Sequence, residues 1–249
     1  MSHVIKLAVN GANGRMGRAL QALLRDDARF ELAACVNASD GWRDAPALDV
    51  VLDFSTPEGF DAALTHCDLY GVALVSGTTG LDAGQLQRLG AAAAAIPVLH
   101  AANFSLGVAV LTRMVRVAAA ALPDWDAEIV EAHHSRKIDA PSGTALALGR
   151  AAAEARGLEF DEVAVLSREG QAGARPANAI GFASIRAGDI VGEHTLLLAG
   201  AGERLELSHR ATDRMIFARG ALTAAAWLAG KTAGNYTMND LITGTPAAR

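Results

Sequence analysis

The sequence predicts an α/β protein in two parts: a parallel sheet interleaved with helices, then an α+β domain with a mixed sheet. Over residues 4–105, short apolar runs alternate with Ala- and Leu-rich helical patterns, which is the βαβ rhythm of a parallel sheet. Small or polar residues follow each apolar run, where open α/β sheets bind ligands. After about residue 105, β-type segments follow one another without a helix between each, as in a mixed or antiparallel sheet.

The apolar runs give the expected elements of the first part. Strands are expected at residues 4–9, 31–37, 49–54, 72–76 and 97–101. Helical spacing of apolar residues begins near Met16 and recurs over residues 58–69 and 82–95,. We expect residues 1–104, completed by 215–249, to form this domain.

The second domain is expected to span residues 105–214. A helix over residues 106–122 leads to a strand at 127–132 and to a second helix that opens near Ser142. The remaining β-type segments are residues 163–166, 179–186, 193–198 and 204–208. The last helical pattern, residues 215–228, fits either part from the sequence pattern alone.

Composition excludes several classes of function. The net charge of -5 and the absence of any run of basic residues argue against a nucleic-acid-binding protein,. The longest apolar stretch, near residues 89–99, is mostly alanine and contains Pro97, so we expect no membrane span and no signal peptide. Cys35 and Cys67 form no CxxC pair, which argues against a disulfide framework or a thiolate metal site and favours a cytoplasmic protein.

A glycine-rich segment, Gly11-Ala12-Asn13-Gly14-Arg15-Met16-Gly17, joins the first strand to the first helix. Backbone N–H groups and the positive end of a helix dipole meet there, as a pyrophosphate requires. The usual fingerprint is GxGxxG, and Asn13 occupies its second glycine position. The pattern therefore predicts a Rossmann-like dinucleotide-binding domain, with a simple packing turn as the alternative.

The end of the second strand does not determine the cofactor. An acidic residue there is typical of NAD sites, and a nearby arginine is typical of NADP sites. The chain has Asn37 at this point, with Asp40 and Arg43 a little further on. NADH and NADPH both remain open.

The densest polar segment is residues 131–145. It contains His133, His134 and Lys137, and its spacing matches no zinc motif. Lysine is rare in this chain, at three positions among the 22 Lys and Arg residues. Histidine titrates near neutrality and lysine can donate a proton where arginine cannot, so the segment predicts proton transfer, against the alternative of a solvated strand end.

A helix start follows directly. Ser142 is a candidate N-cap, and the amides from Gly143 and Thr144 onward would be exposed at the helix N-terminus,. Such a terminus attracts an anion such as a carboxylate. A plain helix cap explains Ser142 equally well.

The motifs EAHHxxKxDxPSGTA, GxxGRMGR, GTTG, AANFS, SREG and IGFASIRAGDIVGEHT, with the terminal RMIFARGAL, occur in one order along nearly the whole chain. Together they closely resemble the 4-hydroxy-tetrahydrodipicolinate reductase (dihydrodipicolinate reductase) family. The resemblance implies a homotetrameric enzyme of diaminopimelate and lysine biosynthesis. It would use NADPH and/or NADH to reduce a cyclic dicarboxylate with loss of water, giving tetrahydrodipicolinate.

The resemblance also implies roles for individual residues. His133 and Lys137 would be catalytic, and His134, Gly143 and Thr144, beside Ser142, would bind substrate. The cofactor-binding residues, with Asn37 added for its position at the second strand, would be Gly11, Ala12, Asn13, Gly14, Arg15, Met16, Gly77, Thr78, Thr79, Ala101, Ala102, Asn103 and Phe104. No metal is expected.

Two features depart from the family. Asn37 stands where relatives often carry an acidic residue, and the connection over residues 38–48 is shorter than is common. Two alternatives are another two-domain NAD(P)-dependent dehydrogenase of amino-acid metabolism and a dinucleotide-sensing regulator without chemistry. Neither explains HHxxK followed by PSGT as fully as the resemblance does.

Overall fold

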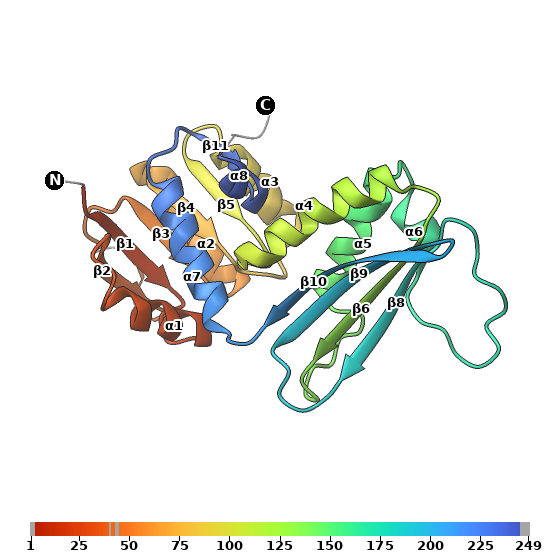
Figure 1. Cartoon of the computed structure of the whole chain (residues 1–249). Helices are drawn as coiled ribbons and strands as arrows, with labels where there is room; N and C mark the ends of the chain where they lie inside the picture. The colour runs from red at the N-terminus through yellow and green to blue at the C-terminus, as the bar shows by residue number, and fades with distance from the viewer. Residues whose placement is uncertain (1–2, 40, 43–44, 245–249) are drawn as a thin grey trace. The chain divides into compact units, whose positions relative to one another are not determined.

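A computed structural model describes residues 3–39, 41–42 and 45–244. The chain divides into two compact units. Unit 1 contains residues up to Leu106 together with those from Met215 onward, and unit 2 is Gly107–Arg214. Figure 1 shows the elements of each unit.

Unit 1 is built on a six-stranded sheet in the order β11-β5-β4-β3-β1-β2, in which every neighbouring pair is parallel. β2 lies on one side of β1 and β3 on the other, so the winding direction reverses at β1 and the carboxyl ends of β1 and β3 frame a crevice,. The strands are β1 (Ile5–Asn10), β2 (Phe30–Val36), β3 (Val50–Asp53), β4 (Ala73–Ser76), β5 (Pro97–His100) and β11 (Gly234–Tyr236).

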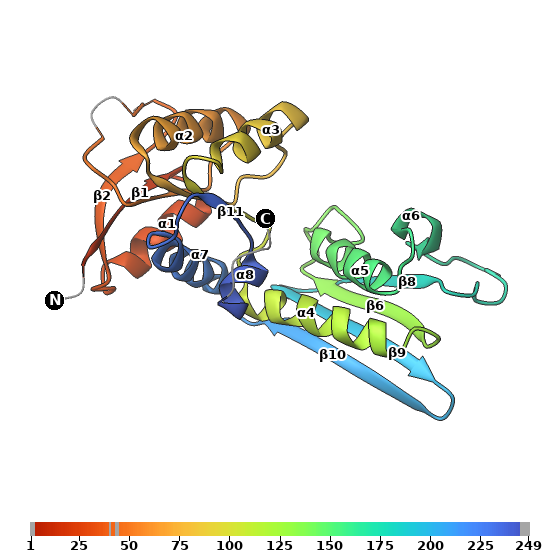
Figure 2. The same cartoon turned by 90° about the horizontal axis from the view of Figure 1, so that it is seen from above.

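Helices cover both faces of this sheet. α1 (Arg15–Leu24) packs against α7 (Met215–Leu228), and α2 (Pro57–Tyr70) packs against α3 (Ala83–Ala92). Figure 2 shows the two pairs on opposite faces. Both faces of the central strands are therefore buried, and β3 and β4 are buried at every position, as expected for a parallel sheet. A short helix, α8 (Met238–Thr243), follows β11.

Unit 2 contains a five-stranded mixed sheet in the order β10-β9-β6-β8-β7. β6 pairs antiparallel with β9 and parallel with β8, which confirms the predicted mixed sheet. The strands are β6 (Asp126–His133), β7 (Ala164–Val165), β8 (Ile180–Arg186), β9 (Gly192–Gly200) and β10 (Glu203–Ala211). The helices are α4 (Leu106–Ala121), α5 (Gly143–Ala155) and α6 (Phe160–Val163).

Helices α4 and α5 bury one face of this sheet. Val115 of α4, Leu148 of α5, Ile129 of β6 and Leu196 of β9 share a single core. Burial alternates along β9, because successive side chains of a strand point to opposite faces. Every second residue of β6 and β9 therefore faces the side on which α5 packs, and this alternation also places the polar residues of the site.

Three short elements, α6, β11 and α8, are not predicted from the sequence. These elements are four, three and six residues long, too short for a periodic pattern of apolar residues to appear. No helix in the described part of the chain is long and apolar enough to span a bilayer.

Candidate active site

The glycine loop of unit 1 is tightly packed against its neighbours. Gly11 has a φ of +77°, and a β-carbon there would lie 2.3 Å from the carbonyl oxygen of Phe54. A β-carbon on Gly17 would lie 2.4 Å from the carbonyl oxygen of Gly11. Glycine is therefore required at both positions for the loop to lie between α1 and the β3–α2 connection.

The N-terminus of α1 is left open. Its N-cap is Gly14, no side chain caps it, and its first turn holds no acidic residue. By contrast, α2 is capped by Thr56 and carries Glu58 in its first turn. Of these two helix ends, α1 therefore offers the free N–H groups and positive dipole that bind phosphate. Arg15 and Met16 are the first two residues of this helix.

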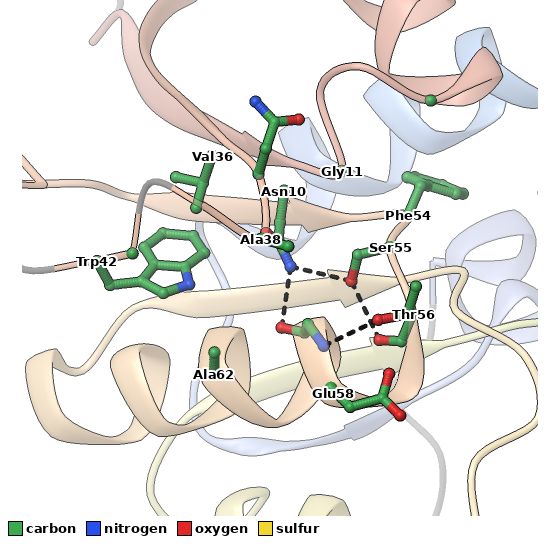
Figure 3. A pocket seen from close by; sticks show the side chains of 14 residues that line it. Asn10, Gly11, Val36, Ala38, Trp42, Phe54, Ser55, Thr56, Glu58 and Ala62 are labelled. Carbon is green, nitrogen blue, oxygen red and sulfur yellow. Dashed lines mark hydrogen bonds between the residues drawn. The ribbon is translucent and has the colours of Figure 1, made fainter.

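A pocket of about 400 Å³ opens beside this loop. Figure 3 shows Gly11 and Phe54 at one end and Val36, Trp42 and Ala62 toward the other. Asn37 also lines it, and its side-chain oxygen accepts a 2.9 Å hydrogen bond from the amide of Asn13. A glycine cradle, an open helix N-terminus and an apolar far end fit the phosphates and the adenosine of a dinucleotide. Asp40 and Arg43 lie outside the described residues.

The buried carboxylate of Asp53 links the carboxyl ends of β1, β3 and β4 through hydrogen bonds. It accepts hydrogen bonds from Asn10, Ser55, Ser76 and Thr78, and it is fully buried. Four donors offset the cost of burying the carboxylate. Thr78, which was predicted to touch the cofactor, thus directs its hydroxyl to Asp53.

The other predicted cofactor residues follow β4 and β5. A β-carbon on Gly77 would lie 2.2 Å from the ring of Phe54. Phe104 meets that ring edge to face, with centroids 5.3 Å apart. Both residues therefore lie against an aromatic wall of the pocket. Thr79 is exposed, Ala101 and Ala102 follow the end of β5, and the side chain of Asn103 accepts from the amide of Ser105.

In unit 2, the centre of the polar cluster is the buried Glu131 on β6. Its carboxylate accepts from both terminal nitrogens of Arg186, at 2.9 and 2.8 Å, and from the amide of Ser142 at 3.2 Å. His133 Nδ1 lies 2.6 Å from the same carboxylate. Burial opposes ionisation, but the hydrogen bonds from Arg186, Ser184 and His133 outweigh it and lower the pKa of Glu131 to about 2. The group is therefore an anion at neutral pH.

This anion orients His133. With Nδ1 held by Glu131, Nε2 is the ring nitrogen left for other partners,. Nε2 lies beside Gly192 of β9, where a β-carbon would come within 3.0 Å of it. The side chain of His133 is 13% exposed. The arrangement of a buried carboxylate that fixes an imidazole is suited to proton transfer.

His194 of β9 stands next to His133. The two rings meet edge to face with centroids 5.1 Å apart, and the hydroxyl of Ser142 lies 3.0 Å from His194 Nε2. That hydroxyl also accepts from the amide of Ala145, which confirms Ser142 as the N-cap of α5. Burial, aided by the neighbouring His133, lowers the pKa of His194 to about 4, so this ring is neutral at neutral pH.

The low pKa of His194 predicts a pH dependence of stability. The folded state takes up the proton less readily than the unfolded state, whose reference pKa is 6.5. Stability is therefore fully present above pH 6.5 and falls as the pH drops from 6.5 toward 4, by roughly 3 kcal/mol. Urea unfolding measured at several pH values from 8 to 4 gives the unfolding free energy at each pH. In His194→Gln this free energy should fall less between pH 6.5 and pH 4 than in the wild type. A variant with the same pH dependence as the wild type would contradict the assignment.

Lys137 follows β6 in the turn that leads to α5. Its Nζ lies 2.7 Å from each carboxylate oxygen of Asp139, and its hydrogen bond lowers the pKa of Asp139. Partial burial and the nearby cations Arg214 and Arg136 lower the pKa of His134. The cluster thus combines cations with the N-terminus of α5 at Gly143 and Thr144, which suits a ligand with more than one carboxylate.

Sequence reasoning missed three members of this cluster: Glu131, Arg186 and His194. Glu131 stands in the EAHH motif, and the other two stand in IGFASIRAGDIVGEHT. The register aligns Glu131 with His194 on one side and His133 with Arg186 on the other. His194 could have been identified from the sequence as a polar residue at a position of β9 where the alternation of buried and less buried residues predicts an apolar side chain. Among the described residues, no group of three His, Cys, Asp or Glu side chains could hold a metal ion.

Comparisons with known proteins agree across both units. Family models described as dihydrodipicolinate reductase, N-terminus and C-terminus, match residues 5–104 and 107–242. A 4-hydroxy-tetrahydrodipicolinate reductase of Xanthomonas campestris pv. campestris (strain B100) is 49% identical over 96% of this chain and 98% of its own. A protein of the same name from Alkalilimnicola ehrlichii is 45% identical over 95% and 98%.

Among solved structures, a dipicolinate-bound dihydrodipicolinate reductase from Paenisporosarcina sp. TG-14 matches with a TM-score of 0.77. It is 27% identical and covers 94% of this chain and 98% of its own. A myo-inositol dehydrogenase from Corynebacterium glutamicum matches with a TM-score of 0.57 at 14% identity, over 99% of this chain and 91% of its own, and so shares the fold alone.

Proposed function

The chain belongs to the dihydrodipicolinate reductase family, and we propose that unit 1 holds the cofactor and unit 2 holds the substrate and the proton donors. The protein is an NAD(P)H-dependent oxidoreductase that reduces 4-hydroxy-tetrahydrodipicolinate to tetrahydrodipicolinate with loss of water, in lysine and diaminopimelate biosynthesis. The observation that carries the proposed roles is the buried Glu131 carboxylate, which fixes His133 near the start of α5.

In unit 1 the glycine loop and the open N-terminus of α1 would hold the pyrophosphate. Gly11 and Gly14 let the backbone approach, and Asn37 lies where the adenosine ribose is expected. Bound there, the reduced nicotinamide supplies a hydride. The side-chain oxygen of Asn37 accepts from the backbone N–H of Asn13, and we propose that this uncharged side chain borders the ribose, which suits either NADH or NADPH.

In unit 2 the N-terminus of α5 would bind one substrate carboxylate through the amides of Gly143 and Thr144,. Lys137 and His134 would meet the polar groups of the ring. Hydride addition to an unsaturated imine builds negative charge at a neighbouring carbon, so a nearby acid must supply a proton. His133, held by Glu131, and Lys137, paired with Asp139, are the groups proposed to hold and deliver it.

We propose that the protein is a homotetramer in the cytoplasm. The face of the unit 2 sheet opposite α4 and α5 supports an assembly, since Ile185 of β8 is 48% exposed there and Val130 and Leu197 are half-buried. Free thiols at Cys35 and Cys67 suit a reducing compartment. The alternatives of a different dehydrogenase or a regulator without chemistry lose support, because the matches cover both units and carry the name of one enzyme.

The decisive experiment supplies the full chain with 4-hydroxy-tetrahydrodipicolinate, together with NADPH or NADH. We expect oxidation of the reduced nicotinamide, measured by the loss of its absorbance, and we expect it to stop when this substrate is omitted. Absence of turnover with both cofactors would overturn the function. Side-by-side kinetics with the two cofactors would also measure the preference that Asn37 leaves open.

A further inference from the structure

Trp42 lines the cofactor pocket at the end far from the glycine loop. It lies in the short connection between β2 and β3, which carries no helix or strand in its described part. Part of the Trp42 side chain packs against the core of unit 1, and the side chain also borders the pocket.

The order of groups along a dinucleotide indicates which of them would lie beside Trp42 if a dinucleotide were bound in this pocket. The pyrophosphate belongs at the N-terminus of α1 and the adenosine ribose at the end of β2, where Asn37 stands. The next group outward is the adenine base. The pocket lining at that position is apolar, with Val36 at the end of β2, Ala38 just after the strand, Trp42 in the loop and Ala62 on α2.

The indole ring of Trp42 is supported by the side chains of two aromatic residues of α2. It stacks on the imidazole of His66, with centroids 4.5 Å apart and an angle of 27° between the planes. His66 is 7% exposed and in turn contacts the ring of Tyr70 at 4.7 Å. Both supporting rings belong to α2, so the position of Trp42 is anchored to a regular helix. A pre-positioned ring loses little entropy when a ligand stacks on it.

We propose that Trp42 is an adenine-stacking residue, supplied to the cofactor site by the short β2–β3 connection. This inference rests on the proposed cofactor site in unit 1. A stacked base interacts through its π face, which is identical in NADH and NADPH. Trp42 should therefore strengthen the binding of both cofactors equally, and the choice between them must come from elsewhere.

The first test uses Trp42→Ala and Trp42→Leu with three reductants: NADH, NADPH and reduced nicotinamide mononucleotide, which has no adenosine. We expect KM to rise about tenfold for NADH and for NADPH, with kcat nearly unchanged and KM for the mononucleotide unchanged. The leucine variant keeps apolar bulk beside His66, so it separates stacking from packing. Wild-type KM for NADH in the leucine variant would overturn the proposal, as would an equal loss for the mononucleotide.

A second readout is independent of turnover. ADP-ribose should quench the tryptophan fluorescence of the wild type, and Trp42→Phe should remove that quench while keeping most of the affinity for ADP-ribose, measured by calorimetry. Trp227→Phe is the matched control, because Trp227 packs on Tyr236 and Lys231, and its quench should persist. Quenching that survives in Trp42→Phe would overturn the stacking role. A wild type that oxidises neither cofactor would instead overturn the proposed function.

Discussion

Replacing Lys137 with alanine should lower kcat about 100- to 1000-fold, the range typical of losing a general acid. The ammonium group is held by two 2.7 Å contacts to Asp139 in the turn that leads from β6 to α5. Its removal takes away both a proton donor and a charge that a substrate carboxylate would meet. KM for the cofactor should stay at the wild-type value, because the proposed cofactor-binding residues belong to unit 1.

Two further variants show whether the lower kcat comes from the lost proton donor or from the lost positive charge. Lys137→Arg keeps the positive charge but replaces a side chain that can donate a proton with one that effectively cannot, so its kcat should stay low while KM for the substrate recovers in part. Lys231→Ala is the matched control, since Lys231 lies over the ring of Trp227 in unit 1. Steady-state kinetics on the three variants is the measurement. Wild-type turnover in Lys137→Arg would remove proton donation from the role of Lys137.

The parts of unit 1 that the sequence predicted share one property: their signal is local. The glycine loop, the strand before it and the helix after it are contiguous, so apolar periodicity and small residues identify them together. β11 pairs with β5 across a long stretch of chain and contributes only three residues. Nothing within three residues distinguishes such a strand from a loop.

The cluster in unit 2 shows the same limit at the level of side chains. His133 and Lys137 were visible because they stand close together in a segment rich in polar residues. Glu131 becomes informative only when the register places His194 opposite it and Arg186 within reach. Pairing between strands distant in sequence is set by the packing of the whole sheet, so the carboxylate that orients His133 could be seen only in the fold.

Replacing Glu131 with glutamine should lower kcat about 100-fold while leaving KM for the cofactor unchanged. The amide group of glutamine is a donor, and it would face either Arg186 or His133 Nδ1, both of which already point protons at this position. His133 would lose the anion that fixes its ring. A low-field proton NMR signal from Nδ1–H, present in the wild type and lost in the variant, would report this role directly, and its persistence would contradict it.

The same substitution should destabilise unit 2 by about 3 kcal/mol, because it leaves Arg186 without its buried partner. The folded pKa of Glu131 is about 2, below the reference value of 4.5. The carboxylate therefore contributes stability in full above pH 4.5 and loses it as the pH falls toward 2. The difference in unfolding free energy between wild type and Glu131→Gln should accordingly shrink below pH 4.5. The matched control is Glu193→Gln, which removes one partner of the exposed ion pair with Arg210. Its unfolding free energy should stay near that of the wild type at every pH. An equal loss of stability in this control would show that any carboxylate of this sheet has the same effect.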